Sequence, residues 1–386
     1  MINKWYVLTI DQIPFNVPDL GQLEVGLLAD SIEGGITSGN GPFCKLVEAK
    51  LEDQLGIHRA LLTTSCTHAL ELAGLVSGLK IGDEIIVPAF TFVSTASAFL
   101  INGVVPVFVD VEEDTLNLNP VLVEKAITRK TKAICVVHYG GMPANLIRLT
   151  ELARQYNLLL IEDNAHGLYS KYYGKYTGTF GTFATQSFHE TKNVICGEGG
   201  ALLINDLNYV ERAETLREKG TNRSAFLRGQ VDKYSWVEIG SSWVLSDLLA
   251  ALLWGQLQRA DQINSRRLSI YNRYLDELAP WAEKFNVRLP VRDKNTECTG
   301  HLFHLRFENL EMRSSFIQYL KDADISSVFH YQALNVSDVG RSIGGFVGQC
   351  PVSENASECL TRLPIYSLLT DDQQSRIIDR TTSFFS

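Results

Sequence analysis

Six short apolar runs between residues 60 and 204 alternate with segments of helical periodicity, and this alternation constrains the fold more than any other feature. The runs are Ala60–Thr63, Glu84–Val87, Val105–Val109, Ala133–Val137, Leu158–Ile161 and Ala201–Ile204. Because they are almost continuously apolar, they predict strands of a sheet whose two faces are both covered. Helical patterns lie between them at Thr67–Val76, Asn119–Thr128 and Asn145–Tyr156. Repetition of strand, helix and strand predicts a mostly parallel α/β sheet.

The rest of the chain predicts a second, smaller unit. A long helical pattern follows Asp247 and continues to Leu278, and an α+β pattern begins at about residue 285. A chain of 386 residues is long enough for one large and one smaller domain. The predicted division is residues 1–250, an N-terminal segment with the large α/β domain, and residues 251–386, a linking helix with a small C-terminal α+β domain.

Composition excludes several classes of protein. The net charge of -9 argues against a nucleic-acid-binding face, which needs a basic surface. The N-terminus lacks the apolar region of a signal peptide, and no uncharged apolar run is long enough to cross a bilayer. Seven scattered cysteines without metal-ligand spacing predict reduced thiols and no metal site. We therefore expect a soluble cytoplasmic protein.

The segment from Gln186 to Asn193, followed by Gly197-Glu198-Gly199-Gly200, carries the most informative lysine. Lys192 follows a strand-like run and precedes a glycine-rich turn. A lysine held there is partly desolvated, which lowers its pKa and frees the amine to form a Schiff base. A single lysine is far more often an ordinary surface cation, so Lys192 needs support from its neighbours.

That support comes from an acid at a strand end. The apolar run Leu158–Ile161 leads into Glu162 and Asp163. A carboxylate in that place keeps the pyridine nitrogen of pyridoxal 5'-phosphate (PLP) protonated. The order Asp163, Ser187, Lys192 favours a cofactor lysine over a surface cation.

Other candidates allow two interpretations each. Ser65-Cys66-Thr67-His68 opens a helix, where free amides bind phosphate, although an ordinary N-cap is the commoner role. Phe92 follows a strand and is able to stack on a pyridine ring, although core packing is commoner for such a residue. Arg217, Lys219, Arg223, Arg228 and Lys233 form either a solvated loop or a patch for a diphosphate.

Two motifs carry a resemblance to a known family. Glu162-Asp163-x-Ala165-His166 and Ser187-Phe188-His189-x-x-Lys192-Asn193 resemble the DegT/DnrJ/EryC1/StrS sugar aminotransferases, and the likeness runs from Gly34–Gly39 to Arg362–Tyr366. Within this family, the stretches around Arg217–Ser224, Arg228–Tyr234 and Ile239–Ser242 resemble the transaminases that form dTDP-4-amino-4,6-dideoxygalactose.

The resemblance implies a PLP-dependent aminotransferase of fold type I, with Lys192 and Asp163 as catalytic residues. It implies that the amides of Thr67 and His68 and the hydroxyl of Ser187 hold the cofactor phosphate. Phe92 and His166 then contact the cofactor, and Ser242 stands where many relatives use an asparagine from the second subunit of a homodimer. The implied substrate contacts are Thr37, Ser38, His330 and Tyr331, together with Lys219, Arg223 and Arg228 of the basic run.

The implied reaction moves the amino group of L-glutamate to a dTDP-4-keto-6-deoxy sugar, giving dTDP-4-amino-4,6-dideoxygalactose and 2-oxoglutarate. One alternative is another nucleotide-sugar aminotransferase with a different 4-epimer or a 3-amino product. A second is a PLP-binding regulator without turnover, against which the intact Lys192, Asp163 and Ser187 argue.

Overall fold

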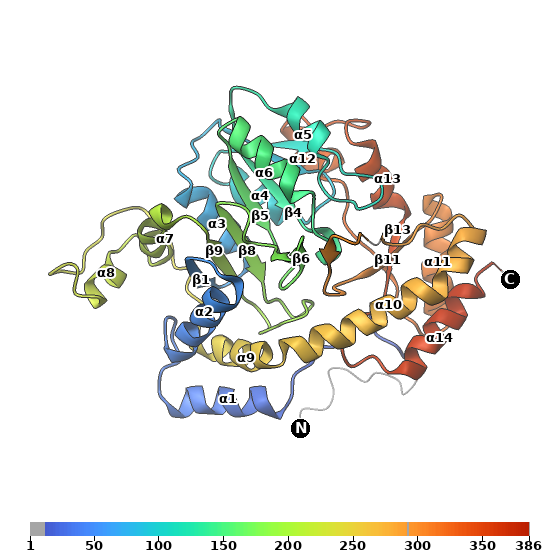
Figure 1. Cartoon of the computed structure of the whole chain (residues 1–386), viewed down its shortest axis with the longest axis horizontal. Helices are drawn as coiled ribbons and strands as arrows, with labels where there is room; N and C mark the ends of the chain where they lie inside the picture. Colours follow the sequence, from blue (N-terminus) through green and yellow to red (C-terminus); the bar gives the residue numbers. More distant parts are fainter. Residues whose placement is uncertain (1–11, 292, 386) are drawn as a thin grey trace.

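A seven-stranded sheet forms the centre of the protein in the computed structural model, which describes residues 12–291 and 293–385 (Figure 1). Its strand order is β1(Arg59–Thr63)-β9(Gly200–Ile204)-β8(Phe183–Ser187)-β5(Leu159–Asp163)-β4(Thr131–Val137)-β2(Glu84–Pro88)-β3(Val105–Val109). Strands β3, β2, β4, β5 and β8 pair in parallel, whereas β9 runs antiparallel to both of its neighbours. The predicted mostly parallel sheet is confirmed.

Helices cover both faces of this sheet. Leu61 and Cys135 pack on one face against α3(Cys66–Val76), α4(Ser94–Leu100) and α7(Val210–Arg217). Their neighbours Leu62 and Ile134 point to the other face, which is covered by α2(Pro42–Leu55), α9(Asp247–Gln258), α5(Pro120–Ala126) and α6(Leu146–Gln155). Successive side chains of a strand point to opposite faces, so burial on both sides explains the continuous apolar runs.

The long helical pattern after Asp247 is realised as two helices. Helix α9 ends at Arg259 (φ -107°, ψ 4°), where α10(Ala260–Lys284) begins. Arg259 donates hydrogen bonds to Asp19 and to Glu24 of α1(Gln22–Glu33), which ties this junction to the N-terminal segment. Helix α10 then runs from beneath the central sheet toward a second core (Figure 1).

That second core is built around an antiparallel sheet of β11(Phe303–Arg306), β13(Leu360–Leu363) and β12(Val328–Phe329). Helices α10, α11(Leu310–Asp322) and α14(Asp371–Thr382) bury Tyr274, Phe316 and Ile377 there. Ile13 joins this core and pairs with Ile325, so the start of the described chain packs on its C-terminal part. The division into residues 1–250 and 251–386 stays a prediction.

Smaller elements complete the fold. A third sheet consists of β10(Thr296–Glu297), β6(Lys171–Tyr172) and β7(Lys175–Tyr176). The short helices are α8(Arg223–Leu227), α12(Asp338–Ser342) and α13(Pro351–Cys359), with 3-10 turns at Tyr139–Gly141, Leu207–Tyr209 and Leu334–Val336. In the described ranges no helix has the length and apolarity to cross a bilayer, and no cluster of acidic, histidine and cysteine side chains is arranged for a metal ion.

Candidate active site

A cavity of about 720 Å³ lies at the carboxyl ends of β4, β5 and β8, where an α/β sheet binds its ligands. Residues of the second sheet, among them Val328 and Arg362, form its opposite wall. Eight of the predicted site residues line it: Thr67, Phe92, Asp163, His166, Ser187, Lys192, His330 and Tyr331. The structure thus brings together residues that are up to 264 positions apart in the sequence, from Thr67 to Tyr331.

Lys192 enters the cavity from the loop that follows β8. The loop is closed by hydrogen bonds from the Cys196 amide to the Phe188 carbonyl and from the Phe188 amide to the Gly199 carbonyl. Burial lowers the pKa of the Lys192 ammonium to about 8, although the neighbouring Cys66 thiol and the Asp163 carboxylate act in the opposite direction. A substantial fraction of this amine is therefore neutral near physiological pH and available as a nucleophile or base.

Asp163 ends β5 and presents a buried carboxylate to the same cavity. Its Oδ2 accepts a hydrogen bond from Thr95 Oγ1 at 2.7 Å, and its Oδ1 accepts one from the Ala165 amide at 3.3 Å. Burial raises the pKa of Asp163, and the two hydrogen bonds together with the charges of Lys192 and His138 offset this effect only in part. A protonated ring nitrogen in the cavity is the partner that this carboxylate lacks.

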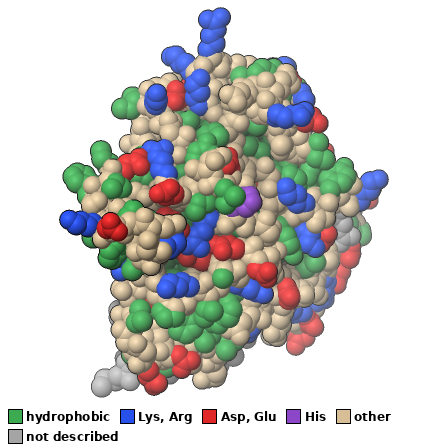
Figure 2. Space-filling model, turned by 60° about the vertical axis from the view of Figure 1, so that its left-hand side comes forward, with side chains coloured by type: hydrophobic (Ala, Val, Ile, Leu, Met, Phe, Trp, Pro, Cys, Tyr) green, Lys and Arg blue, Asp and Glu red, His purple; other side chains and the backbone are tan. Residues whose placement is uncertain are grey.

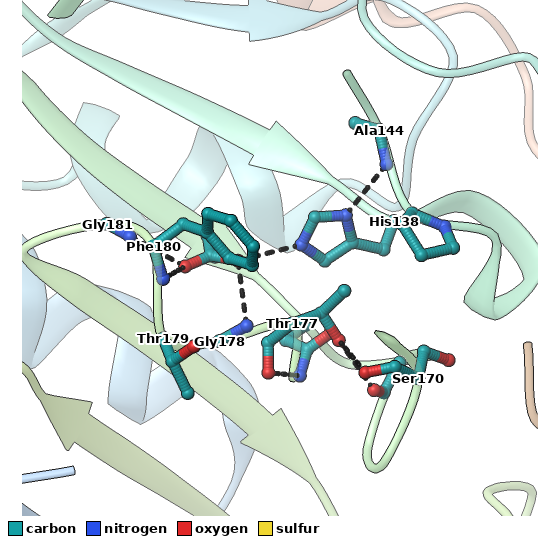
Figure 3. A network of polar contacts seen from close by, with 12 residues as sticks. His138, Ala144, Ser170, Thr177, Gly178, Thr179, Phe180 and Gly181 are labelled. Carbon is teal, nitrogen blue, oxygen red and sulfur yellow. Dashed lines mark hydrogen bonds and ion pairs between the residues drawn. The ribbon is translucent and has the colours of Figure 1, made fainter. Parts of the chain in front are cut away.

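Glu162, the residue before Asp163, is held in a different network. Its Oε1 accepts hydrogen bonds from the amides of Phe180 and Gly181, each at 2.7 Å, and its Oε2 accepts one from Gly178 at 2.7 Å. His138 Nε2 donates to Glu162 at 3.1 Å, while its Nδ1 accepts from the Ala144 amide, as Figure 3 shows around His138. This network holds the end of β5, and with it Asp163, against the loop of residues 178–181.

The start of α3 forms the end of the cavity suited to a phosphate. The first amides of a helix have no partner within the helix, and they face an anion favourably. Thr67 Oγ1 is bonded to Ser94 Oγ at 2.7 Å, and Ser65 and Ser187 also line the cavity. Gly200 permits this arrangement, because a Cβ there would lie 2.4 Å from the Cys66 amide nitrogen.

His68 does not line the cavity. Its amide donates to Ser65 Oγ at 3.1 Å, which is the ordinary N-cap bond, and its ring contacts Thr64 and Trp243 outside the cavity lining. The N-cap and the phosphate interpretations therefore apply to different residues: Ser65 caps the helix through His68, and Thr67 faces the cavity.

Aromatic and histidine side chains form another part of the cavity lining. Phe92 is 55% exposed toward it, and its ring centroid lies 6.1 Å from that of Tyr331. His166 Nδ1 accepts the Gly140 amide, so its Nε2 carries the proton and donates to the Tyr331 hydroxyl at 3.1 Å. Burial holds the pKa values of His166 and His330 well below the ordinary value, so both imidazoles are neutral. The Tyr331 hydroxyl is left to donate its own proton to a ligand.

The other predicted site residues lie outside this chain's cavity. Thr37 and Ser38 are exposed, and their carbonyls accept bonds from Ser246 and Asp247. Lys219 and Ser242 are exposed as well, on the segment of residues 219–242 that contains α8 and projects at the left of Figure 1.

The two arginines of this segment are paired with acids. Arg223 bonds to Glu218 at 3.2 Å, and Arg228 bonds to Glu214 at 2.7 Å. Figure 2 shows basic and acidic side chains intermixed on the face that includes this side of the molecule. The roles predicted for these seven residues, His68 included, remain predictions.

Several lining residues were not predicted from the sequence. They include Arg362, Arg267, His301, Phe15, Asn16 and Ser94. Arg267 and Arg362 are the cations among them, and each comes from a segment that is distant in the sequence from the Asp163 and Lys192 motifs.

Comparison with known proteins identifies the family. The model of the DegT/DnrJ/EryC1/StrS aminotransferase family matches residues 18–382, which is nearly the whole chain. The chain belongs to this family. It is an aminotransferase, and the cofactor of this family is pyridoxal phosphate, as the sequence predicted.

Relatives of known sequence and structure agree with this membership. The uncharacterized protein MJ1066 of Methanocaldococcus jannaschii is 32% identical over 377 residues, which cover 95% of each chain. The putative sugar aminotransferase Spr1654 of Streptococcus pneumoniae, solved in a PMP form, superposes with a TM-score of 0.89 at 28% identity, covering 96% of this chain and 98% of that one. DesV of S. venezuelae superposes with a TM-score of 0.85 at 32% identity, covering 94% of each chain.

The residues of the cavity fit this cofactor. A buried acid with a raised pKa, a lysine with a lowered pKa, and a helix start lined by hydroxyl groups match its ring nitrogen, aldehyde and phosphate. When bound, the group acts as an electron sink at the carbon that carries the amino group. Asp163 would hold the ring nitrogen, Lys192 the reactive carbon, and Thr67, Ser65 and Ser187 the phosphate.

Proposed function

We propose that this aminotransferase moves the amino group of L-glutamate to a dTDP-4-keto-6-deoxy sugar, giving dTDP-4-amino-4,6-dideoxygalactose and 2-oxoglutarate. The observation that supports it most is the half-buried Lys192 with a pKa of about 8, facing the same cavity as Asp163. Spr1654 is described as a putative sugar aminotransferase, which supports a sugar as the acceptor. The stretches between Arg217 and Ser242 that resemble dTDP-4-amino-4,6-dideoxygalactose transaminases support the finer assignment.

Lys192 supplies the proton transfers that the exchange requires. A neutral amine takes a proton from the carbon that bears the amino group and returns it to a neighbouring atom, and a pKa near 8 suits both steps. Asp163 stays ionised once a cation faces it, and the hydroxyl of Tyr331 is placed to donate a hydrogen bond to an oxygen of the sugar.

We further propose that the working form is a homodimer with shared active sites, in the cytoplasm. Trp236 and Ile239, on the segment of residues 219–242, are 74% and 82% exposed, and Val25 and Ile32 of α1 are each 57% exposed. Hydrophobic side chains gather at the lower edge of the face in Figure 2. Apolar surface of this extent favours contact with a second copy. In such a dimer the segment carrying Lys219, Arg223, Arg228 and Ser242 would reach the partner's cavity.

The product of the purified enzyme tests the reaction. L-Glutamate and dTDP-4-keto-6-deoxyglucose should give 2-oxoglutarate and a single amino sugar, and NMR of that sugar reads both the aminated carbon and its configuration. A 3-amino product, or the gluco epimer, would replace the proposed assignment with the corresponding alternative.

The shared site has a separate test. Lys192→Ala protein mixed with Arg223→Ala/Arg228→Ala protein should recover part of the activity through hybrid dimers. Full activity of a monomer, measured by light scattering at the assay concentration, would contradict it.

A further inference from the structure

Asn193, the residue after Lys192, ties the lysine to distant parts of the chain. Its Nδ2 donates one hydrogen bond to Asn264 Oδ1 of α10 at 2.9 Å and a second to the Thr299 carbonyl at 2.9 Å. Its Oδ1 accepts a hydrogen bond from His301 Nδ1 at 3.0 Å. Thr299 and His301 belong to the segment that leads into β11, and both are buried. One side-chain amide therefore joins the lysine to α10 and to the start of the second sheet.

The acceptors of these bonds fix the orientation of the Asn193 amide and the tautomer of His301. Both hydrogens of Nδ2 point at oxygen atoms, so Oδ1 is the atom that faces His301, and an amide oxygen accepts but does not donate. Burial holds the pKa of His301 well below its ordinary value, so the imidazole is neutral and carries its proton on Nδ1. His301 lines the same cavity as Lys192, and its ring centre lies 4.3 Å from that of His166. The amide thus also orients a ring of the cavity wall.

The chain on the other side of Lys192 is weakly held. Glu190 and Thr191 are exposed, and the Lys192 amide donates to the His189 carbonyl within the same turn. Among the described residues, the hydrogen bonds of Asn193 are those that join this turn to α10 and to the segment before β11. A lysine has a long and flexible side chain, so the place of its amine depends on how firmly its main chain is held.

We propose that Asn193 is a positioning residue, which holds the main chain at Lys192 so that the amine stays in the buried cavity and in line with the reacting carbon. This assignment rests on the proposed function, in which Lys192 moves the protons. A displacement of about 1 Å at a catalytic group costs up to about 100-fold in rate, so an anchor on the neighbouring residue has a measurable effect. Because α10 and the segment before β11 hold the other ends of the bonds, the lysine is placed only when both walls of the cavity are assembled.

Four variants test the assignment. Asn193→Ala removes all three bonds, Asn264→Ala removes one acceptor and leaves the other two partners, and the double variant combines the changes. Asn335→Ala is the matched control. The Nδ2 of Asn335 also donates to one main-chain oxygen, the Phe346 carbonyl at 3.0 Å, and to one side-chain oxygen, Glu354 Oε1 at 2.7 Å, but Asn335 does not line the cavity. Thermal melting shows how much stability each variant has lost.

The first measurement is the pKa of Lys192 in the full-length protein after removal of the cofactor. Trace labelling with acetic anhydride over a range of pH, read on the Lys192 peptide by mass spectrometry, gives the pH at which the amine becomes reactive. Burial lowers the pKa of Lys192 to about 8, so an amine that swings toward solvent regains hydration and its pKa rises. Asn193→Ala should shift the labelling midpoint to higher pH, Asn264→Ala should shift it less, and Asn335→Ala should leave it at the wild-type value.

The second measurement is the half-reaction of the PLP-loaded enzyme with L-glutamate, followed by the absorbance of the bound cofactor. Asn193→Ala should lower the maximal rate about 10-fold, which is about 1.4 kcal/mol in the barrier. The half-saturating concentration of L-glutamate should stay within about twofold of the wild type, because Asn193 does not line the cavity. The double variant should match Asn193→Ala alone, since Asn264 acts through Asn193.

Three results would overturn the role of Asn193. They are equal changes in Asn193→Ala and Asn335→Ala, additive effects of the Asn193 and Asn264 substitutions, and a raised half-saturating concentration at an unchanged maximal rate. If Asn193→Ala does not fold, an Asn264→Ala protein with a wild-type labelling midpoint has the same meaning. Failure of the proposed function would look different, because a wild type that does not react with L-glutamate would show only that the donor is wrong. The labelling midpoint depends on neither donor nor sugar, so it would still decide the role of Asn193.

Discussion

Replacing Glu162 by glutamine measures how much the hydrogen-bond network next to Asp163 contributes to the stability of the fold. Both oxygens of Glu162 accept two N–H donors each, and the side chain is fully buried. Glutamine has one oxygen and one NH₂ group. In either orientation of the amide, the NH₂ group would point at two of the four N–H donors, which would then lack an acceptor. Hydrogen bonds to a charged acceptor are each worth about 1.5–3 kcal/mol, which makes the loss about 3–6 kcal/mol before relaxation. We expect about 3 kcal/mol, because a neutral amide is cheaper to bury than a carboxylate.

Thermal melting at saturating PLP and fixed protein concentration measures this loss. For a chain of this size, 3 kcal/mol corresponds to a fall of roughly 4 °C in Tm. Glu190→Gln is the matched control, because Glu190 is exposed and its side chain has no contact described in the structure. A Glu162→Gln protein that melts within about 1 °C of this control would refute the reasoning.

The pH dependence gives a second check with a defined sign. Burial raises the pKa of Glu162, but His138 and the backbone amides outweigh it and hold the pKa below the ordinary value. Its contribution to stability is then complete above the unfolded pKa of about 4.3 and is lost as the pH falls from there toward the folded pKa. The difference in Tm between wild type and Glu162→Gln should be constant from neutral pH to about 5.5 and shrink below that.

Three further predictions concern the cofactor. Asp163→Asn should weaken PLP retention, measured by dialysis, and slow the glutamate half-reaction by orders of magnitude; a rate equal to that of the wild type would remove Asp163 as the partner of the ring nitrogen. Gly200→Ala should lower PLP affinity and Tm, because its Cβ would meet the Cys66 amide at 2.4 Å, whereas Gly26→Ala, with no atom within 4 Å, should do neither. Ser187→Ala should weaken PLP binding about fivefold, because one neutral hydrogen bond is worth about 1 kcal/mol. Ser242→Ala should weaken PLP binding less than Ser187→Ala does. The reverse order in fluorescence titrations of PLP would show that the exposed serine is the stronger phosphate contact.

The central sheet was predictable because its evidence is local. Runs such as Ala133–Val137 are apolar on both faces, and each lies within one or two residues of the observed strand. Strand β8 was indicated only as the strand-like run before Lys192 and was absent from the six apolar runs, because Thr185 and Gln186 are polar, yet both are fully buried. Tertiary packing overrode the polar pattern there.

The meeting of Asp163 and Lys192 in one cavity was also predictable. Asp163 stands at the end of an apolar run and Lys192 follows a second strand, and strand ends on a parallel sheet meet at one edge. For the arginines of the basic run, the sequence could not decide between a solvated loop and a diphosphate patch. Their spacing was compatible with a diphosphate patch, but Arg223 and Arg228 bond to Glu218 and Glu214 of the same chain.

The sequence by itself therefore determined the sheet, the family and many of the residues that line the cavity, because periodicity and motif spacing are properties of neighbouring residues. The tertiary structure alone decided what closes the cavity. Tyr331 bonds to His166, and Arg362 lines the same cavity as Lys192 without an ion pair to a carboxylate of the described residues, only because the second sheet packs over the strand ends of the first. Whether a charge is left without a partner depends on every residue folded around it, and no local pattern records that.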